Sequence, residues 1–427
     1  MLAGPRWEAL PCIIFSNYMN LVPVTIDSIE LGKPLPFNLM DQHGVLLAKK
    51  ALVIATRGDL KDLANRDGGL FIQNVEAEAL RRAYLTHLNT LLREDTALGV
   101  IAESNPYTPP PQRRIASINE RIDWLDLQEQ VNYLLRDTNV QTFNDRLAFI
   151  HDTLGNQLER NGDEVLFALI HLSATETRMY SATHSLLVCA LCGLASRHVL
   201  HWAAEEEDAL RKAALTMNLG MTELQDKLAT QTEPPDIHQR AGINEHAQKS
   251  VAMLQALGVS DTVWLDAVRD HHLQSPGTLQ SKALPQRLAR LIQRADMFVA
   301  RLSPRVSRTP ISPAAAMHSC YFDENKAVDE AGTALIKVAG IYQPGSFVKL
   351  ANNELAVVIK RGANTNMPRV AVVANRLGIP LVEPTIRETS LKDYRVVASV
   401  PHRLVKVKIN LERMLPLTVT PASDGPW

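Results

Sequence analysis

The pattern of hydrophobic and polar residues changes twice along the chain. Residues 22–73 hold short apolar or β-branched runs separated by Gly, Pro and Asn, a texture that predicts a small strand-rich unit. Apolar residues then recur at helical spacing from about residue 115 to 340, which predicts a large helical domain. Beyond it, two β-rich runs at residues 346–350 and 355–359 flank an Asn-Asn turn and predict a hairpin. Further strands are expected at residues 369–374, 394–400 and 404–409.

Two segments connect the strand-rich unit to the helical domain. Leucines recur near helical spacing among charged residues from 76 to 95, which predicts an amphipathic helix packing on its own domain. Four prolines between Glu103 and Gln112 exclude a helix interior and predict an extended spacer. We therefore expect a mainly α protein with a small β-rich N-terminal domain at residues 1–100, a Pro-rich linker at 101–114, a helical domain at 115–340 and a β-rich C-terminal segment at 341–427.

Composition places the chain among ordinary globular proteins. Of 427 residues, 46% are apolar and 21% charged, which excludes disorder as the main state. The formal net charge of −1 gives no global electrostatic reason to expect DNA or RNA as a partner. Four cysteines cannot form a disulfide framework, no apolar run has bilayer length, and no secretion signal opens the chain. We expect a cytoplasmic protein without a membrane span.

Histidine indicates the chemistry, because eight of the thirteen histidines fall between residues 171 and 272. These eight histidines are His171, His184, His198, His201, His238, His246, His271 and His272. Among them, His184 shares a helical face with Leu187, Val188 and Leu191. Helical spacing therefore predicts that the His184 ring points into the bundle.

The same arithmetic places His271 on a face with Trp264 and Val268, and Asp296 at the edge of an apolar stripe. Buried polar groups need partners. Imidazoles and a carboxylate that converge from several helices could satisfy one another around a divalent metal. The alternative, which stays open on this evidence, is that each is an ordinary hydrogen-bonded core or surface residue.

The order of these residues resembles the HD-GYP branch of the HD phosphohydrolase superfamily. The resemblance spans residues 163–361 and implies an HD-type helical bundle; members of the branch hydrolyse cyclic di-GMP at a centre of two or three metals. The small domain before the bundle also looks like one that precedes the catalytic domain in many members. Five blocks carry the resemblance: residues 180–188 with His184, 243–254 with His246, 267–272 with His271 and His272, 294–298 with Asp296, and 340–358 with its Gly-Ile-Tyr-Gln-Pro-Gly run.

This chain departs from the family at the His-Asp pair that gives the family its name. Met217 and Asn218 stand in its place, and Met221 replaces the lysine expected near the scissile phosphate. Asn218 is neutral and cannot bridge two cations, and a thioether is a poor ligand for Mn²⁺ or Fe²⁺. After His272 the family's Gly-x-Gly-Tyr-Pro loop is also lost.

Carried over residue by residue, the resemblance leaves ligands for one metal. The first cation would keep only His184 and Asp296, whereas His246, His271 and His272 could still hold the second. Three histidines and a water form a feasible set for zinc. Without a second cation the attacking hydroxide loses much of its activation, so we predict a catalytically impaired protein.

Three functional hypotheses follow. The first is a degenerate HD-GYP-like protein of bacterial signalling that acts by binding cyclic di-GMP, another nucleotide or a signalling protein, alone or as a homodimer, with one divalent metal (zinc, manganese or iron) or none. The second is an active cyclic di-GMP phosphodiesterase with a rearranged site. The third treats the histidines as structural relics in a protein that works only through protein contacts.

Two further patterns invite chemistry that we do not expect. His151-Asp152 is the one His-Asp dipeptide in the sequence, but it precedes His184, whereas the family's pair follows the corresponding histidine. Cys189 and Cys192 have redox-motif spacing within an apolar helical run that lacks the strand-to-helix entry of redox motifs. We predict that both cysteines pack in the core.

Overall fold

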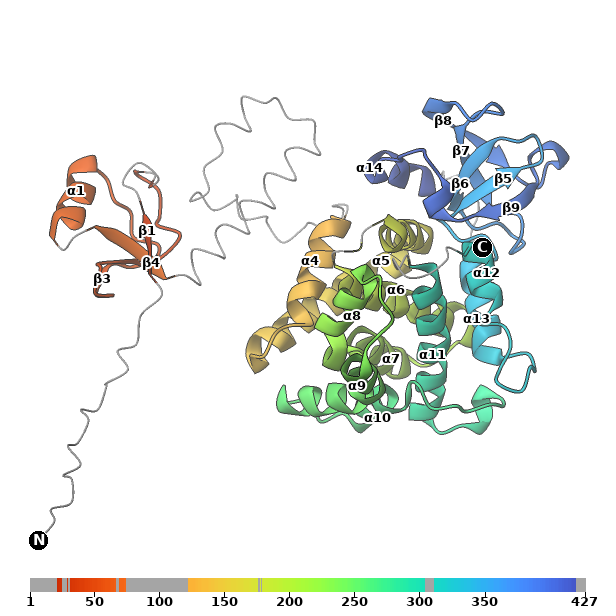
Figure 1. Cartoon of the computed structure of the whole chain (residues 1–427), viewed down its shortest axis with the longest axis horizontal. Helices are drawn as coiled ribbons and strands as arrows, with labels where there is room; N and C mark the ends of the chain where they lie inside the picture. Colours follow the sequence, from red (N-terminus) through yellow and green to blue (C-terminus); the bar gives the residue numbers. More distant parts are fainter. Residues whose placement is uncertain are drawn as a thin grey trace, which may run out of the picture. The chain divides into compact units, whose positions relative to one another are not determined.

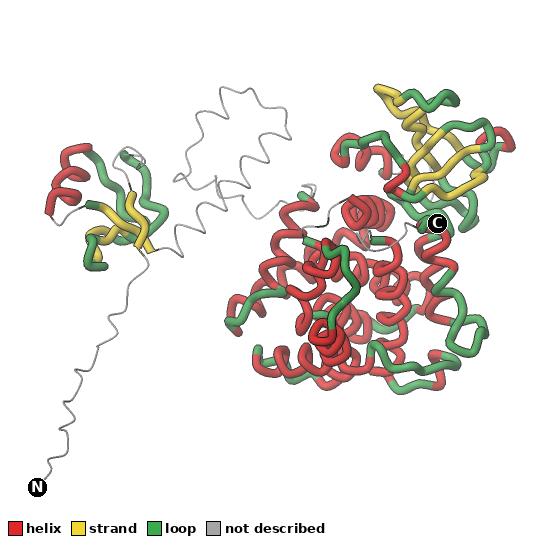
Figure 2. Tube along the Cα trace, in the orientation of Figure 1, coloured by secondary structure: helices red, strands yellow, loops and turns green. Residues whose placement is uncertain are grey.

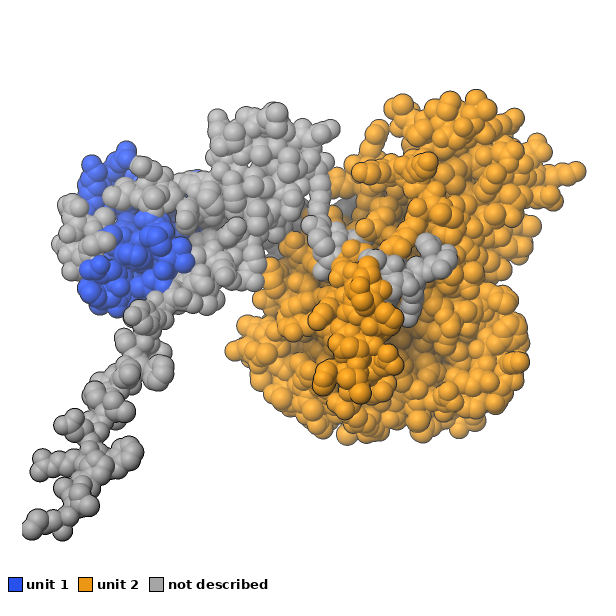
Figure 3. Space-filling view, in the orientation of Figure 1, with its two compact units in different colours: residues 1–121 blue, residues 122–427 orange. Residues whose placement is uncertain are grey.

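The computed structural model divides into two compact units, Met1–Arg121 and Ile122–Trp427 (Figure 3). The residues it describes are 21–24, 29, 31–66, 69–73, 122–175, 177, 179–303 and 311–419. The helix predicted at 76–95 and the linker predicted at 101–114 lie outside these residues.

In its described residues, the first unit is a small sheet with one helix, and a strand-rich unit is what its texture predicts. The antiparallel sheet has the strand order β1-β4-β2-β3, and Phe37, Leu39 and Ile72 are fully buried in its core. The turn between β2 and β3 is held by Asp41, whose Oδ1 accepts the backbone N–H groups of His43 and Val45 at 2.8 Å each. Its elements are β1 (Leu21–Val24), β2 (Leu39–Met40), β3 (Leu46–Ala48), α1 (Arg57–Arg66) and β4 (Leu70–Gln73).

The second unit is the expected helical bundle, with α6 at its centre (Figures 1 and 2). All residues of α6 are buried, and it packs against α4, α5, α7, α11 and α13. Such a helix has no face in water, and from Leu186 to Ala195 its sequence carries no polar side chain. The helices are α4 (Trp124–Leu134), α5 (Val140–Thr175), α6 (Tyr180–Ala195), α7 (Ala204–Thr216), α8 (Thr222–Thr230), α9 (Ile237–Ala256), α10 (Thr262–Asp270), α11 (Leu284–Leu302), α12 (Pro313–His318), α13 (Glu330–Ala339) and α14 (Leu411–Met414).

The same central position explains a stretch of membrane-like composition. From the sequence we expect no apolar run of bilayer length, but by length and composition Tyr180–Leu200 is such a run; 78% of its most apolar window is buried inside the bundle. This is what the core helix of a folded domain looks like.

A five-stranded antiparallel sheet of order β8-β7-β6-β5-β9 closes the second unit at one end of the bundle (Figure 1). The predicted hairpin is confirmed: β5 and β6 pair antiparallel around a turn in which Asn353 has φ of 71°. The sheet buries one face, with Phe347 and Val357, on the bundle core. Its strands are β5 (Phe347–Leu350), β6 (Leu355–Lys360), β7 (Arg369–Ala374), β8 (Pro380–Glu388) and β9 (Val396–Val400).

The strand expected at residues 404–409 is wrong. His402–Leu404 form a 3₁₀ helix, and the chain then runs without ladder hydrogen bonds. Val405, Val407 and Ile409 nevertheless pack against the bundle core. Alternating apolar residues mark an extended segment with one apolar side. Such a segment can pair in a sheet, or it can lie unpaired against a core, as it does here.

Candidate metal centre

Two helices bring three histidines to one point. His246 lies in the middle of α9, whose N-terminus is fixed by a capping box between Asp236 and Gln239, at 2.8 and 3.0 Å. His271 and His272 follow directly on the last turn of α10. That helix begins at Asp261, whose carboxylate accepts two backbone N–H groups.

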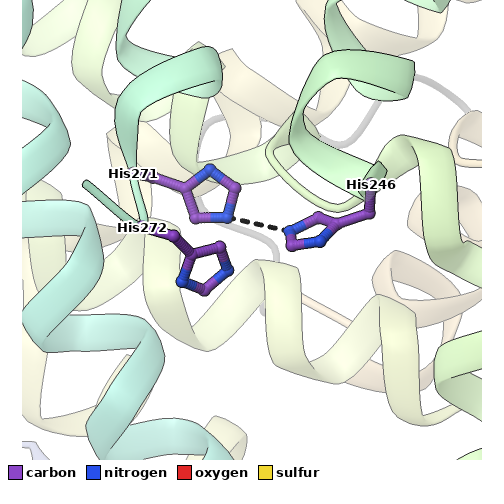
Figure 4. Close-up of side chains that lie close together, drawn as sticks. All are labelled: His246, His271 and His272. Carbon is purple, nitrogen blue, oxygen red and sulfur yellow. Dashed lines mark hydrogen bonds between the residues drawn. The ribbon is translucent and has the colours of Figure 1, made fainter. Parts of the chain in front are cut away.

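The three imidazoles form a compact cluster (Figure 4). One ring nitrogen from each of His246, His271 and His272 lies within 4.8 Å of the others, and Nε2 of His246 is 3.1 Å from Nε2 of His271. The ring centroid of His272 is 4.9 Å from that of His246 and 4.1 Å from that of His271. His246 and His271 are buried, and His272 is exposed. We call these residues the histidine triad.

Backbone carbonyls determine which ring nitrogens carry protons. Nδ1 of His246 lies 2.5 Å from the carbonyl oxygen of Ile243, and Nδ1 of His271 lies 2.6 Å from that of Val268. A carbonyl only accepts, so both Nδ1 atoms donate, and in a neutral ring the lone pair is then on Nε2. This arrangement is typical of metal-binding histidines, whose second nitrogen is held by an outer partner.

Burial keeps the two inner rings neutral. It lowers the pKa of His271 to about 3, with the neighbouring His272 as a lesser cause, and it lowers the pKa of His246 below its ordinary value. Two neutral rings that donate through Nδ1 direct bare Nε2 lone pairs at each other across 3.1 Å. Such a contact is repulsive unless a cation or a shared proton lies between the nitrogens.

The donor set fits a borderline divalent metal. With Zn–N bonds of about 2.0–2.1 Å, a nitrogen separation of 3.1 Å corresponds to an N–Zn–N angle of about 100°, near the tetrahedral value. The exposed third ring, His272, leaves the site open toward solvent. The histidine triad could therefore hold one metal ion.

His184 and Asp296 form a second pair. His184 projects from α6 and is 1% exposed, and its Nε2 lies 2.7 Å from Oδ1 of Asp296 on α11. Burial raises the pKa of Asp296, but the hydrogen bond to His184 and the nearby imidazoles outweigh this and hold that pKa well below its usual range. Nδ1 of His184 is buried without a hydrogen-bond partner among the described residues.

The structure thus divides the five predicted ligands into a triad and a pair. Within the described parts of the chain, no carboxylate lies within 4.8 Å of all three imidazoles. From the sequence we expect imidazoles and a carboxylate to converge. The structure brings His246, His271 and His272 together, but no carboxylate joins them among the described residues. Metal binding itself stays a prediction for all five residues.

The segment with Met217 and Asn218, singled out in the sequence analysis, lies against the helix of His246. Met217 is fully buried, Asn218 is 4% exposed, and both follow the end of α7. Ser250 on α9 donates through Oγ to the carbonyl of Met217 at 2.8 Å and accepts the N–H of Gly220 at 2.9 Å. The altered residues are therefore held next to the triad helix, and neither supplies a negative charge.

A polar cavity of about 490 Å³ adjoins the triad and the pair. Both His272 of the triad and Asp296 of the pair line it. The cavity is lined by His272, Gln274, Gln293, Arg294, Asp296, Met297, Ala300, Arg301, Asp323 and Glu324. A ligand in this space would reach both groups of predicted site residues.

Of the other residues singled out in the sequence, Cys189, Cys192 and His151 are buried, whereas Asp152 is exposed. Burial raises the pKa of Cys189 to about 12 and that of Cys192 well above its ordinary value, so both thiols stay protonated and inert. His151 is buried on α5, where the guanidinium of Arg211 donates to its carbonyl at 2.8 Å. The prediction that the cysteines pack in the core is confirmed.

Sequence reasoning missed a group of buried charges beside the cavity. Arg290 and Arg294 of α11 are 2% exposed each, and both are paired with Glu324. They lie four residues apart, but long helices carry many such pairs on their solvent face. Arg290 and Arg294 differ from such surface pairs because they are buried, and no local sequence pattern predicts that a charged residue is buried.

Comparisons with known proteins give no match in sequence and a weak likeness in structure. No family model matches the sequence, and no curated protein matches it. Among solved structures, it is similar to Bd1817, an HDG"Y"P protein from Bdellovibrio bacteriovorus, with a TM-score of 0.40 and 14% identity over 74% of this chain and 99% of that one. So low a TM-score carries no inference about the site.

Proposed function

We propose that this chain is a degenerate HD-GYP-like protein of bacterial cyclic di-GMP signalling that acts by binding and is catalytically impaired. The observation that carries the proposal is the histidine triad, with two Nε2 atoms facing each other at 3.1 Å and no carboxylate within 4.8 Å of all three rings among the described residues. The triad would hold one divalent metal, and the cavity beside it would hold the ligand.

The charge balance of the site supports impaired catalysis. A two-metal phosphohydrolase needs anionic ligands between its cations, to offset their repulsion and to activate a bridging hydroxide. Asn218 is neutral, and Asp296 is held by His184 at 2.7 Å. A single bound metal would polarise a phosphate oxygen or a water, without the paired stabilisation of attacking and leaving oxygens. The protein would then recognise a ligand more readily than cleave it.

Metal content is the first test. Protein purified without added chelator should carry one zinc, manganese or iron ion per chain by mass spectrometry. His246→Ala and His271→Ala should lose it, whereas His238→Ala should not, because His238 is an exposed histidine on the same helix α9. Metal-free wild-type protein, with His246→Ala changing stability alone, would support the structural-relic hypothesis.

Product analysis separates binding from catalysis. Cyclic di-GMP is incubated with wild type and His271→Ala, with Mn²⁺ or Fe²⁺ under anaerobic conditions, and titrated in parallel by calorimetry. We expect intact substrate and measurable binding. Linear dinucleotide or GMP formed by wild type and not by His271→Ala would support the alternative, an active phosphodiesterase with a rearranged site.

Restoring the family's pair tests the explanation for the loss. Met217→His combined with Asn218→Asp returns an imidazole and a bridging carboxylate beside α9, and the number of bound metals should rise. Met221→Lys serves as the control, since it changes a nearby position without adding a ligand of this kind. An unchanged metal stoichiometry in the double variant contradicts the proposal.

A further inference from the structure

Two buried arginines bind Glu324, which lines the cavity. Arg290 and Arg294 lie one turn apart on α11, and their side chains are only 1% and 3% exposed. Arg294 also lines the cavity, and its Nε is buried without a hydrogen-bond partner in the described part of the chain. A buried guanidinium requires anionic partners, and here two carboxylates supply them.

The two carboxylates differ in how they are held. Asp329 caps α13 by accepting the N–H of Gly332 at 2.8 Å, is 3% exposed, and is bonded to Nε of Arg290 at 3.0 Å. Asp329 is therefore part of the helix framework.

Glu324 belongs to the loop between α12 and α13 and not to a helix, and its side chain is 24% exposed. It accepts two N–H groups from Arg290, at 2.8 and 3.0 Å, and one from Arg294 at 3.2 Å. Glu324 is therefore the carboxylate that faces the cavity.

The contact geometry is that of an occupied anion site. A planar guanidinium that binds a carboxylate through two parallel bonds binds a phosphate in the same way. With Glu324 in place, the two arginines and the two carboxylates balance in charge. Without Glu324, the remaining three groups keep one net positive charge, next to a cavity whose other charged lining residues are Asp296, Arg301 and Asp323.

We propose that Glu324 occupies an anion subsite of this cavity and that the phosphate group of a ligand binds Arg290 and Arg294 in its place. The proposal rests on the proposed function only for the ligand that enters, because the subsite is formed by α11 and the loop without the triad. Glu324 would set the affinity: the ligand must displace a carboxylate already bound there.

The test is phosphate binding by chelated protein, so that no metal contributes. Inorganic phosphate is titrated by calorimetry into wild type, Glu324→Ala and Asp323→Asn. Asp323 lines the same cavity, but its Oδ1 accepts backbone N–H groups of Asn325 and Ala327, so its substitution removes the same charge without vacating the arginines. Glu324→Ala should bind phosphate about tenfold more tightly than wild type, a change of about 1.4 kcal/mol. Asp323→Asn should change the affinity far less.

A second pair of variants separates an anion subsite from an ion pair that only holds the loop on α11. Adding Arg294→Met to Glu324→Ala should abolish the gain, with folding checked by circular dichroism. Glu324→Gln, which stays large enough to cover the arginines, should give a smaller gain than Glu324→Ala. Equal, weak phosphate binding by all variants, or an equal gain in Asp323→Asn, overturns the proposal. Because the titration uses metal-free protein, its failure leaves the metal experiments intact.

Discussion

Acid should weaken the contact between α5 and the C-terminal sheet, because two histidines meet there. His402 donates through Nε2 to the carbonyl of Gly345 at 2.9 Å, and Gly345 packs so tightly on α5 that a Cβ would lie 2.6 Å from the carbonyl oxygen of Phe167. Burial, with His402 as a lesser cause, lowers the pKa of His171 to about 4, and burial lowers the pKa of His402 to about 4. Both rings are therefore neutral in the folded protein near pH 7.

The sign and size of the effect follow from proton linkage. In the unfolded chain both pKa values return to about 6.5. Between about pH 6.5 and 4 the unfolded state binds more protons than the folded state, so the free energy of unfolding falls as the pH falls. From about pH 7.5 to 5, each histidine costs up to about 2 kcal/mol and the pair up to about 4 kcal/mol. Both side chains keep part of their surface in water, so these figures are upper limits.

Urea denaturation at several pH values measures this directly. Wild type is compared with His171→Gln, His402→Gln and the double variant, since glutamine retains hydrogen-bonding capacity without titrating. Protonation of ion-paired carboxylates also lowers the free energy of unfolding in acid, but this contribution is common to all four proteins. The double variant should lose about 2–4 kcal/mol less than wild type between about pH 7.5 and 5. Parallel stability curves for wild type and double variant would refute the reasoning.

Two stability predictions concern the support of the triad. Gly220→Ala should destabilise by about 2–4 kcal/mol and lower metal content, because its Cβ would lie 2.7 Å from the carbonyl oxygen of His246; an unaltered urea midpoint contradicts this. Trp264→Phe should cost about 1–2 kcal/mol, because Nε1 of Trp264 donates to Oγ1 of Thr216 at 2.9 Å in the core. Oγ1 of Thr216 keeps its own bond to the carbonyl of Lys212 at 2.8 Å, so restored stability in Trp264→Phe with Thr216→Val would confirm that the cost comes from the donor lost to this hydroxyl. A wild-type midpoint in the single variant would exclude that cost.

Several elements were readable from local pattern. The strand at Arg369–Ala374 has the predicted bounds, because the five apolar residues after Arg369 are all buried and leave little choice of limits. The strand Pro380–Glu388 was missed. It contains two prolines and is largely exposed, so it is a strand through its pairing with β7 and not through its own composition.

The candidate site divides in the same way. Helical spacing correctly predicts that His184 and His271 are buried, since each shares a face with large apolar residues. It could not predict which partner each would take. The pairing of His184 with Asp296 and the tautomers of the triad depend on helix crossings and on backbone carbonyls, neither of which has a sequence pattern.

The amino-acid sequence by itself determined the helical core, the hairpin and the histidines that enter the bundle, because hydrophobic periodicity acts over a few residues and is written locally. Only the tertiary structure decided that three imidazoles meet at one point, that Asp296 is held by His184, and that Glu324 covers two buried arginines. These contacts join residues from 25 to 112 positions apart in the chain. They depend on how the helices pack, and packing is settled by the whole core at once.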